Sequence, residues 1–220
     1  MREKRKLEAV VLIGSGGHAL VVLDILEAMG LYEVIGVTTN DQEMKGFYGY
    51  PVLGTDDDLP RLLKDGVRLA AIGIGGFKDN QLRKKIYGKL KTLGFQIVTA
   101  IHPSAVIARD VKIGEGSVVF AGVVLNPRVQ IGCNVVVATC STVDHETRVE
   151  DHVLISAGVT VGAYAIVEEE ALLAIGCTVV SRKKVGKNAL VAAGAVVVKN
   201  VVPNTAVIGV PARLWENGPR

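Results

Sequence analysis

One histidine of the chain stands beside two carboxylates in a pattern suited to proton transfer. His145 lies between Asp144 and Glu146, and the chain has four histidines. A neighbouring carboxylate holds an imidazole in one orientation and raises its basicity near neutral pH. Such a histidine can deprotonate a hydroxyl or an amine for attack on a thioester. Simple solvation is the alternative, and we favour it for His152, although that residue is close enough in sequence to share the same surface.

A second group of residues has the composition of an anion site. Gly14, Ser15, Gly16, Gly17 and His18 follow an apolar run and open a helical pattern, where backbone N–H groups favour an anion. We interpret this turn as a site for the phosphate or pyrophosphate of a nucleotide-linked substrate. A tight turn without a ligand and a nicotinamide site are the alternatives. The G-x-G-x-x-G motif of dinucleotide-binding folds is not fully met, because Ala19 stands at the position of the third glycine, although alanine is tolerated there.

His145 lies within an unbroken six-residue repeat. From Ile101 to Val197 every sixth residue is aliphatic, and the residue two positions earlier is small or Val except at Lys183. Hexapeptide repetition is typical of a parallel β-helix, in which three hexads form one coil of eighteen residues. Coils stacked at roughly 4.8 Å place each inward side chain on its equivalent in the next coil. The sequence therefore predicts a β-helix with columns of like residues in its core.

The repeat also places candidate partners for His145. Counted from the inward Val143, His145 falls at a corner with its side chain outward, and Ala163 lies one coil away beside Gly162. The Ala163 N–H could receive the developing oxyanion of a thioester. Three glycines share the eighteen-residue spacing: Gly158, Gly176 and Gly194. They would leave a smooth strip for a long thin ligand, and turn geometry explains them equally well.

Residues 1–100 alternate between strand and helix patterns, which predicts a parallel sheet. We expect a strand at 9–13, a helix at 19–29, a strand at 34–37, a helix at 57–64, a strand at 69–74, a helix at 80–93 and a strand at 95–99. Gly30 and Gly94 stand where helix-ending glycines belong. The prediction is a Rossmann-like domain at 1–100, a β-helix at 101–200 and a tail at 201–220, with the first and last parts covering the two ends of the β-helix.

Composition narrows the classes of partner and compartment. The 220 residues are 49% apolar and 5% aromatic, and Lys and Arg crowd the first six positions, which we interpret as a solvated terminus. Basic residues do not alternate with aromatic ones, so we expect no nucleic-acid partner. No apolar run reaches the roughly 20 residues of a membrane span, and no secretion signal is expected. Three cysteines without metal-ligand spacing favour a cytoplasmic protein.

Several motifs, taken in order, resemble the sugar O- and N-acetyltransferases related to sialic acid O-acetyltransferase, which include bacillosamine-pathway and perosamine N-acetyltransferases. They are the glycine turn at 14–18 and the segments 101–104, 142–146 and 207–213. The resemblance implies a left-handed β-helix, assembled as a homotrimer with acetyl-CoA between neighbouring solenoids and without a metal. It also implies direct attack by a sugar amine or hydroxyl, with His145 as general base and Glu146 as its orienting partner.

The same resemblance assigns binding residues. The nucleotide-sugar would be held by Gly14, Ser15, Gly16, Gly17, His18, Thr38 and Thr39. Acetyl-CoA would be held by Ser156, Ala163, Ile175, Gly176, Ala193, Gly194, Ile208 and Arg213. The chain departs from the family pattern in three places: Thr38 and Thr39 replace an acidic pair, Ala138 replaces an Asn, and Leu154 replaces a His.

The sequence thus predicts an acetyl-CoA-dependent N-acetyltransferase that acts on the amino group of a nucleotide-linked amino sugar. O-acetylation of a sugar such as sialic acid is the alternative. A non-catalytic or metal-binding trimeric solenoid resembling the γ-type carbonic anhydrases is a third interpretation. It is disfavoured because such a zinc site needs three histidines, and these hexads offer His145 and His152.

Overall fold

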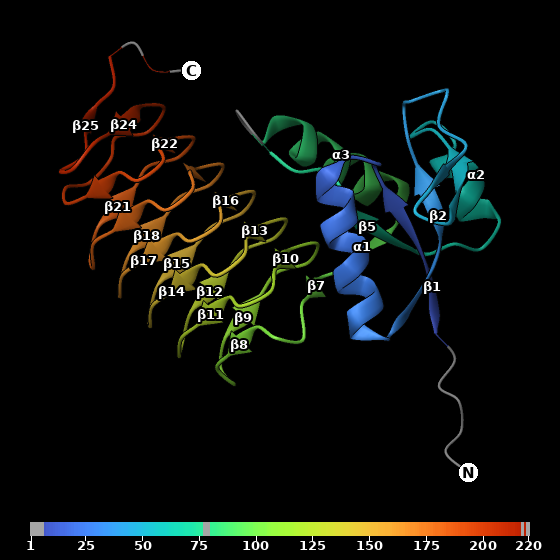
Figure 1. Cartoon of the computed structure of the whole chain (residues 1–220), viewed down its shortest axis with the longest axis horizontal. Coiled ribbons are helices and arrows are strands. Elements are labelled where there is room, and N and C mark those ends of the chain that lie inside the picture. Colours follow the sequence, from blue (N-terminus) through green and yellow to red (C-terminus); the bar gives the residue numbers. More distant parts are fainter. Residues whose placement is uncertain (1–6, 77–79, 217, 219–220) are drawn as a thin grey trace.

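The chain forms an α/β part and a long β-helix, as a computed structural model shows (Figure 1). The structure describes residues 7–76, 80–216 and 218, so the basic cluster of the first six positions lies outside the described residues. The predicted fold class is confirmed. A Rossmann-like sheet precedes a left-handed parallel β-helix, and the change of architecture falls between Ile97 and Ala100.

The α/β part is built on a six-stranded sheet with the order β3-β4-β2-β1-β5-β6. Its elements are β1 (Glu8–Ile13), α1 (Gly17–Met29), β2 (Tyr32–Thr38), β3 (Gly46–Phe47), β4 (Tyr50–Gly54), α2 (Leu59–Lys64), β5 (Leu69–Ile72), α3 (Gln81–Leu93) and β6 (Gln96–Ile97). β1 pairs in parallel with β2 and β5, whereas β3 and β4 are antiparallel. Gly30 and Gly94 adopt the left-handed conformation that ends α1 and α3, which confirms the predicted helix ends.

Several predicted boundaries in the α/β part are wrong. The strand expected at 69–74 ends at Ile72 because a glycine-rich turn follows, and the strand expected at 95–99 is reduced to Gln96–Ile97. The helix expected at 57–64 begins at Leu59. The β3–β4 hairpin was not predicted. Its loop residues Tyr48 and Gly49 have φ of 50° and 86°, as two-residue hairpin turns with positive φ at both positions require.

The β-helix is a three-sided prism of two-residue strands that pair with strands eighteen residues away. Face 1 contains β7 (Ala100–Ile101), β10 (Val118–Val119), β13 (Val136–Val137), β16 (Leu154–Ile155), β19 (Leu172–Leu173) and β22 (Leu190–Val191). Face 2 contains β8 (Val106–Ile107), β11 (Val124–Leu125), β14 (Thr142–Val143), β17 (Thr160–Val161), β20 (Thr178–Val179) and β23 (Val196–Val197). Face 3 contains β9 (Lys112–Ile113), β12 (Gln130–Ile131), β15 (Arg148–Val149), β18 (Ile166–Val167) and β21 (Lys184–Val185).

Every predicted inward residue occupies the second position of one of these strands. From the second coil onward these side chains are almost fully buried, as Val143 and Val161 show at 0% exposure. Burial of one such side chain stabilises the fold by about 1.5–3 kcal/mol. Ile107 and Ile113 of the first coil are half-buried, because α1 packs on β7 and leaves the β8 and β9 edges open. The α/β part therefore covers less of this end than predicted.

The tail closes much of the other end. β24 (Ala206–Ile208) extends face 1 beside β22, and β25 (Arg213–Leu214) pairs with β24 in antiparallel fashion. Val201 forms a bridge with Val185 on face 3. These pairings support a capping role for the tail, and its contact with a coenzyme stays a prediction.

Turns form three edges between the faces. The His145 edge, between faces 2 and 3, contains Arg128, His145, Glu146, Tyr164 and Arg182. The glycine edge, between faces 1 and 2, contains Gly122, Cys140, Gly158, Gly176 and Gly194. The junction edge, between faces 3 and 1, contains Asn134, Asp151, His152, Glu169 and Glu170.

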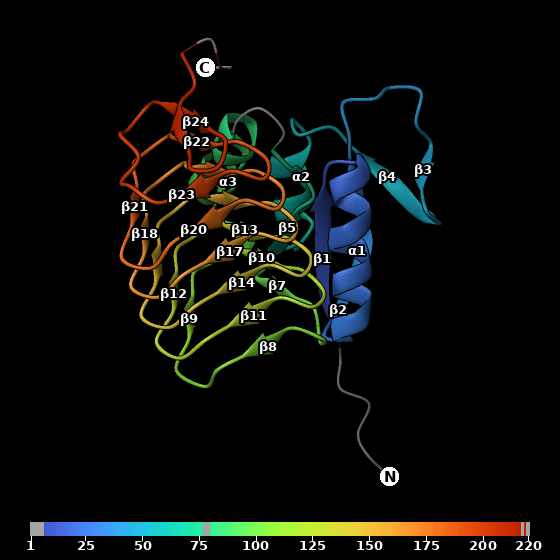
Figure 2. The ribbon, with the colours of Figure 1, turned by 60° about the vertical axis from the view of Figure 1, so that its left-hand side comes forward.

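The α/β part packs against face 1 and along the junction edge (Figure 2). Leu154 and Leu172 of face 1 are each only 7% exposed. α3 contacts the junction edge, where Lys84 Nζ pairs with Glu170 Oε1 at 2.8 Å. Because the His145 edge is opposite face 1 in the prism, it lies on the far side of the β-helix from the α/β part.

Candidate active site

The turn between β14 and β15 presents His145 to solvent. Its backbone carbonyl accepts the Tyr164 N–H at 3.1 Å, and its ring lies edge-on to the Tyr164 ring, with centroids 5.2 Å apart and planes at 85°. The Arg182 guanidinium covers the Tyr164 ring at 4.9 Å from the centroid. These contacts hold the imidazole at an exposed edge, where it can meet a second molecule.

The two carboxylates beside His145 have different partners. Asp144 Oδ1 accepts the His145 backbone N–H and the Asn126 amide, each at 2.8 Å, and the bond from His145 holds the pKa of Asp144 below its ordinary value. Glu146 Oε1 pairs with Arg128 Nη1 at 2.9 Å. In the described part of the chain neither carboxylate forms a hydrogen bond to the imidazole ring. The orienting role of Glu146 stays a prediction.

Ala163 lies beside His145 in the next coil, because Val143 is paired with Val161. Beside it, Gly162 packs on the following coil, where an added Cβ would come within 2.6 Å of the Ser181 backbone nitrogen. Among residues 7–76 and 80–216 the Ala163 N–H has no hydrogen-bond acceptor, so it is available to an oxyanion. Other turn N–H groups share this state, and a role for Ala163 therefore stays a prediction.

The glycine edge combines left-handed turns with open space. Gly158, Gly176 and Gly194 have φ of 66°, 65° and 67°. Tyr164 and Glu170 hold the same left-handed position on the other two edges, although a residue with a Cβ costs roughly 1–2 kcal/mol there. A Cβ added at any of the three glycines would meet no atom within 4 Å. The glycines leave open space along this edge, so a ligand strip stays a prediction beside the turn explanation.

Most of the residues assigned to acetyl-CoA gather on this side of the molecule. Those at or beside the glycine edge are Ser156, Ile175, Gly176, Ala193 and Gly194. Ile208 and Arg213 are paired in the β24–β25 hairpin at the end of face 1. Ala163 is separated from them by face 2, together with His145. A single chain therefore does not bring the predicted base and the predicted coenzyme residues together.

The predicted acceptor residues converge at the carboxyl ends of β1 and β2. Gly14 N–H donates to Thr38 O at 2.9 Å, and Ser15 Oγ lies 2.6 Å from Thr39 Oγ1. Thr38 Oγ1 donates to Asp56 Oδ1 at 3.1 Å, a carboxylate that sequence reasoning missed. The strand order reverses at β1, and ligands of open α/β sheets bind at such points.

A second glycine-rich turn, at 73–76, lies beside the first and was also missed. A Cβ added at Gly75 would come within 3.1 Å of the His18 side chain, so the two turns touch. α1 begins at Gly17 without a side-chain cap, which leaves its first N–H groups free to bind an anion. The Gly-x-Gly-Gly pattern at 73–76, which overlaps the end of the strand predicted at 69–74, is the signal that could have revealed this turn.

The His18 ring packs beside the glycine turns as a neutral group and not as a cation. Its ring centroid lies 5.5 Å from that of Phe120, directly after β10, and its Nε2 lies 3.5 Å from Arg83 Nη1. Burial, and after it the charge of Arg83, lowers the pKa of His18 to about 3. The ring is therefore neutral at neutral pH, and a phosphate would gain no positive charge from it.

His152 does not share the surface of His145, which corrects that expectation. It lies on the junction edge, where its ring centroid is 5.5 Å from that of Tyr87 and its Nδ1 is 2.9 Å from Asn134 Nδ2. Burial is the main cause that lowers the pKa of His152. The residue packs between the β-helix and α3, and Asn80 Nδ2 donates to its carbonyl at 2.7 Å.

Comparisons with known proteins cover both parts of the chain. The model of the PglD N-terminal domain family matches residues 9–90. UDP-N-acetylbacillosamine N-acetyltransferase from Bacillus subtilis (strain 168) is 30% identical over 120 residues, 52% of this chain and 52% of that protein, so the match spans about half of that relative. A histidine-to-alanine variant of GDP-perosamine N-acetyltransferase from Caulobacter crescentus, solved with CoA and GDP-perosamine, is 35% identical with a TM-score of 0.90, covering 96% of this chain and 99% of that chain. The chain belongs to this family of sugar acetyltransferases.

A third member of the sugar acetyltransferase family shows the same architecture. The acetyltransferase domain of PglB from Neisseria gonorrhoeae FA1090, solved with acetyl coenzyme A, is 29% identical with a TM-score of 0.85, covering 96% of this chain and 100% of that chain. The family predicted from the sequence motifs is thus confirmed. The substituted histidine in the Caulobacter enzyme and the bound CoA in both solved relatives agree in kind with the base and donor expected here.

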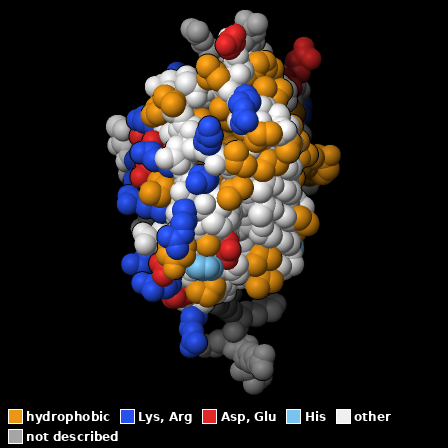
Figure 3. Space-filling model, turned by 90° about the vertical axis from the view of Figure 1, so that its left-hand side faces the viewer, with side chains coloured by type: hydrophobic (Ala, Val, Ile, Leu, Met, Phe, Trp, Pro, Cys, Tyr) orange, Lys and Arg blue, Asp and Glu red, His pale blue; other side chains and the backbone are white. Residues whose placement is uncertain are grey.

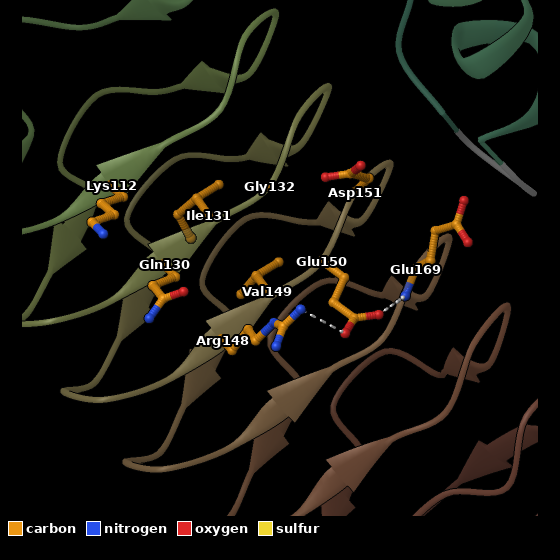
Figure 4. A pocket seen from close by; sticks show the side chains of 9 residues that line it. All are labelled: Lys112, Gln130, Ile131, Gly132, Arg148, Val149, Glu150, Asp151 and Glu169. Atoms are coloured by element: carbon orange, nitrogen blue, oxygen red, sulfur yellow. Dashed lines mark hydrogen bonds and ion pairs between the residues drawn. The ribbon is translucent and has the colours of Figure 1, made fainter.

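A hollow of about 400 Å³ lies on face 3, away from these residues (Figure 4). Lys112, Arg148 and Glu150 are among its lining residues, and Arg148 Nη2 lies 3.6 Å from Glu150 Oε1. Because it faces away from both the glycine edge and the glycine turns, we assign it no part in the reaction. Within the described ranges no group of three His, Cys, Asp or Glu side chains is placed to bind a metal. No helix there is both long and apolar enough to cross a membrane.

Proposed function

We propose that this protein transfers the acetyl group of acetyl-CoA to the amino group of a nucleotide-linked amino sugar. The observation that carries the proposal is its likeness to a perosamine N-acetyltransferase solved with CoA and GDP-perosamine, at 35% identity over 96% of this chain. The open glycine edge and the two adjoining glycine turns support it, because they offer separate places for a donor and an acceptor.

His145 is the general base in this proposal. Its exposed imidazole can accept a proton from the sugar nitrogen while the bond from that nitrogen to the acetyl carbon forms. The Ala163 N–H can donate to the carbonyl oxygen as charge develops on it. Acetyl-CoA supplies the thioester, whose carbon–sulfur bond breaks, and the departing CoA sulfur takes up a proton. The acetyl group passes to nitrogen without an acyl-enzyme.

We propose a homotrimer, in which a neighbouring chain supplies the groups that a single chain keeps apart. His145 lies opposite face 1, whereas the glycine turns contact the end of the face 1 strand β10, where His18 meets Phe120. We propose that His145 of one chain faces the glycine edge and the α/β part of its neighbour. The side of the molecule drawn in Figure 3 carries hydrophobic side chains over its upper part, as a protein contact favours. Exposed apolar residues of face 2, the glycine edge and the tail include Val106, Ile175, Val180, Val198, Val202, Ile208, Val210 and Leu214.

We place the reaction in the cytoplasm. Acetyl-CoA and nucleotide-sugars are both cytoplasmic metabolites, so the substrates would be present together there. The three free thiols of Cys133, Cys140 and Cys177 fit a reducing compartment.

The test is a transfer assay with the purified full-length chain. Acetyl-CoA is incubated in turn with GDP-perosamine, a UDP-linked 4-amino sugar and sialic acid, and release of the CoA thiol is followed. Mass and NMR of the product distinguish an amide from an ester. The proposal predicts an amide on one of the nucleotide-linked amino sugars. An ester on sialic acid as the only product, or no transfer to any acceptor, would contradict it.

A further inference from the structure

Arg83 of α3 is a buried guanidinium without an ion-pair partner among the described residues. Its exposure is 1%, and burial lowers its pKa to about 9, which leaves it charged at neutral pH. Arginine is almost never fully buried unless it is paired, because an unpaired buried ion loses its hydration without a Coulombic return. Among residues 7–76 and 80–216 no carboxylate forms an ion pair with this charge, which makes it suited to neutralise a bound anion.

The groups around the guanidinium are neutral acceptors. Nη1 donates to Ile72 O at 3.0 Å and to Ile74 O at 2.8 Å, and it lies 3.5 Å from His18 Nε2. Nη2 donates to Gly116 O at 2.9 Å, on the first coil of the β-helix, while Nε has no partner. Carbonyl oxygens satisfy these donors without neutralising them, so the positive charge remains.

This charge lies behind the two glycine turns. Ile74 is part of the second turn, and a Cβ added at Gly14 of the first turn would meet the Ile74 side chain at 3.0 Å. The N-terminus of α1, which begins at Gly17, opens at the same point. The buried cation and the positive end of the helix therefore attract an anion to the same space.

The other described groups around the turns do not supply this charge. The described residues of the two turns, 14–18 and 73–76, include neither Lys nor Arg. His18 is neutral because burial lowers its pKa to about 3. Asp56, bonded to Thr38, brings a negative charge to the β2 side, which increases the need for a cation near a bound phosphate.

We propose that Arg83 is the buried counter-charge for the diphosphate of the nucleotide-linked acceptor. It is a positioning residue, because it holds the second turn through Ile72 and Ile74 and acts on the ligand from behind the backbone. The inference rests on the proposed function, which supplies the class of acceptor. It adds Arg83 as the group that makes the two glycine turns selective for a doubly charged anion.

The test is calorimetric titration of the full-length protein with inorganic pyrophosphate and, separately, with CoA. The variants are R83K, R83M and, as a matched control, R68M. Arg68 is exposed and precedes β5 at the end away from the turns. Pyrophosphate affinity should fall roughly tenfold or more in R83M, stay within about threefold in R83K and be unchanged in R68M. CoA affinity should be the same in all four proteins, and R83M should raise the KM of the nucleotide-sugar with kcat unchanged.

Equal pyrophosphate affinity in R83M and the unaltered protein would overturn the inference, as would an equal loss in R83K and R83M. A parallel loss of CoA affinity would assign Arg83 to the fold alone and also overturn it. If circular dichroism shows R83M unfolded, R83Q replaces it with the same expected loss, since its amide can still donate to the Ile72 and Ile74 carbonyls. Absence of pyrophosphate binding in the unaltered protein overturns this inference, whereas absence of acetyl transfer to every amino sugar overturns the proposed function.

Discussion

The β-helix and the α/β part position their functional residues in different ways. His145 and Gly176 occupy exposed turn positions that recur every eighteen residues, so their places follow from the repeat alone. Arg83 is buried and His18 is partly buried, their pKa values are lowered by burial, and they join segments far apart in the sequence. We therefore expect substitutions near His145 and the glycine edge to leave the fold intact. Substitutions around the acceptor turns should disturb a network of packed side chains.

Removal of the imidazole should give the largest effect on the β-helix side. His145→Ala should lower kcat by about two to four orders of magnitude, because a positioned general base contributes that much. The KM values for both substrates should change little, and thermal unfolding should be unaffected because the side chain is exposed. Steady-state kinetics with both substrates varied is the measurement. Arg148→Ala, an exposed residue of face 3, is the control, and near-normal turnover of the His145 variant would remove it from the mechanism.

A bulkier residue on the glycine edge should act on the donor alone. Asn tolerates positive φ, so Gly176→Asn keeps the turn but fills the open space beside it. The KM for acetyl-CoA should rise by about tenfold, equivalent to about 1.4 kcal/mol, with a smaller rise in Gly176→Ala. The KM for the nucleotide-sugar should not change. An unaltered KM for acetyl-CoA in both variants would show that the glycine serves the turn only.

The same comparison explains how far sequence reasoning could go. In the β-helix each six-residue step repeats one local geometry, so the inward position of Val143 and the corner position of His145 could be predicted without tertiary information. The strip of open space at Gly158 could be suspected but not decided, since its argument needs the non-glycine turns of the other edges.

The α/β part resisted prediction where long-range packing decides. Tyr48 and Gly49 form a hairpin loop, although a Tyr-Gly pair is not a typical hairpin-turn sequence. Arg83, in an otherwise amphipathic helix, looks like a surface residue until α3 is packed between β5 and the first coil. Asp56 becomes part of the acceptor cluster through its hydrogen bond to Thr38, eighteen residues earlier in the chain.

Lowering the pH should destabilise the α/β part through His18, an effect smaller than those of the substitutions above. The folded-state pKa of His18, about 3, lies below the ordinary value of 6.5, so between these values the unfolded chain binds a proton that the folded chain excludes. This contribution is complete above about pH 6.5 and declines as the pH falls toward 3. From pH 7 to pH 5 the unaltered protein should lose about 1–2 kcal/mol more of its unfolding free energy than His18→Gln. Urea midpoints at the two pH values measure this, and equal losses in the two proteins would mean that the pKa of His18 is not lowered in the folded protein.

The most direct measurement of the central claim is complementation between two inactive variants in mixed trimers. His145→Ala lacks the base, and Gly17→Asp places a carboxylate at the start of α1, where an added Cβ meets no atom within 4 Å. If His145 of one chain works with the acceptor turns of its neighbour, random mixing in equal amounts restores about a quarter of the sites, because each requires one intact partner of each kind. Activity of about a quarter of the unaltered protein is the predicted result. Activity no higher than the sum of the two separate variants would contradict a site shared between chains.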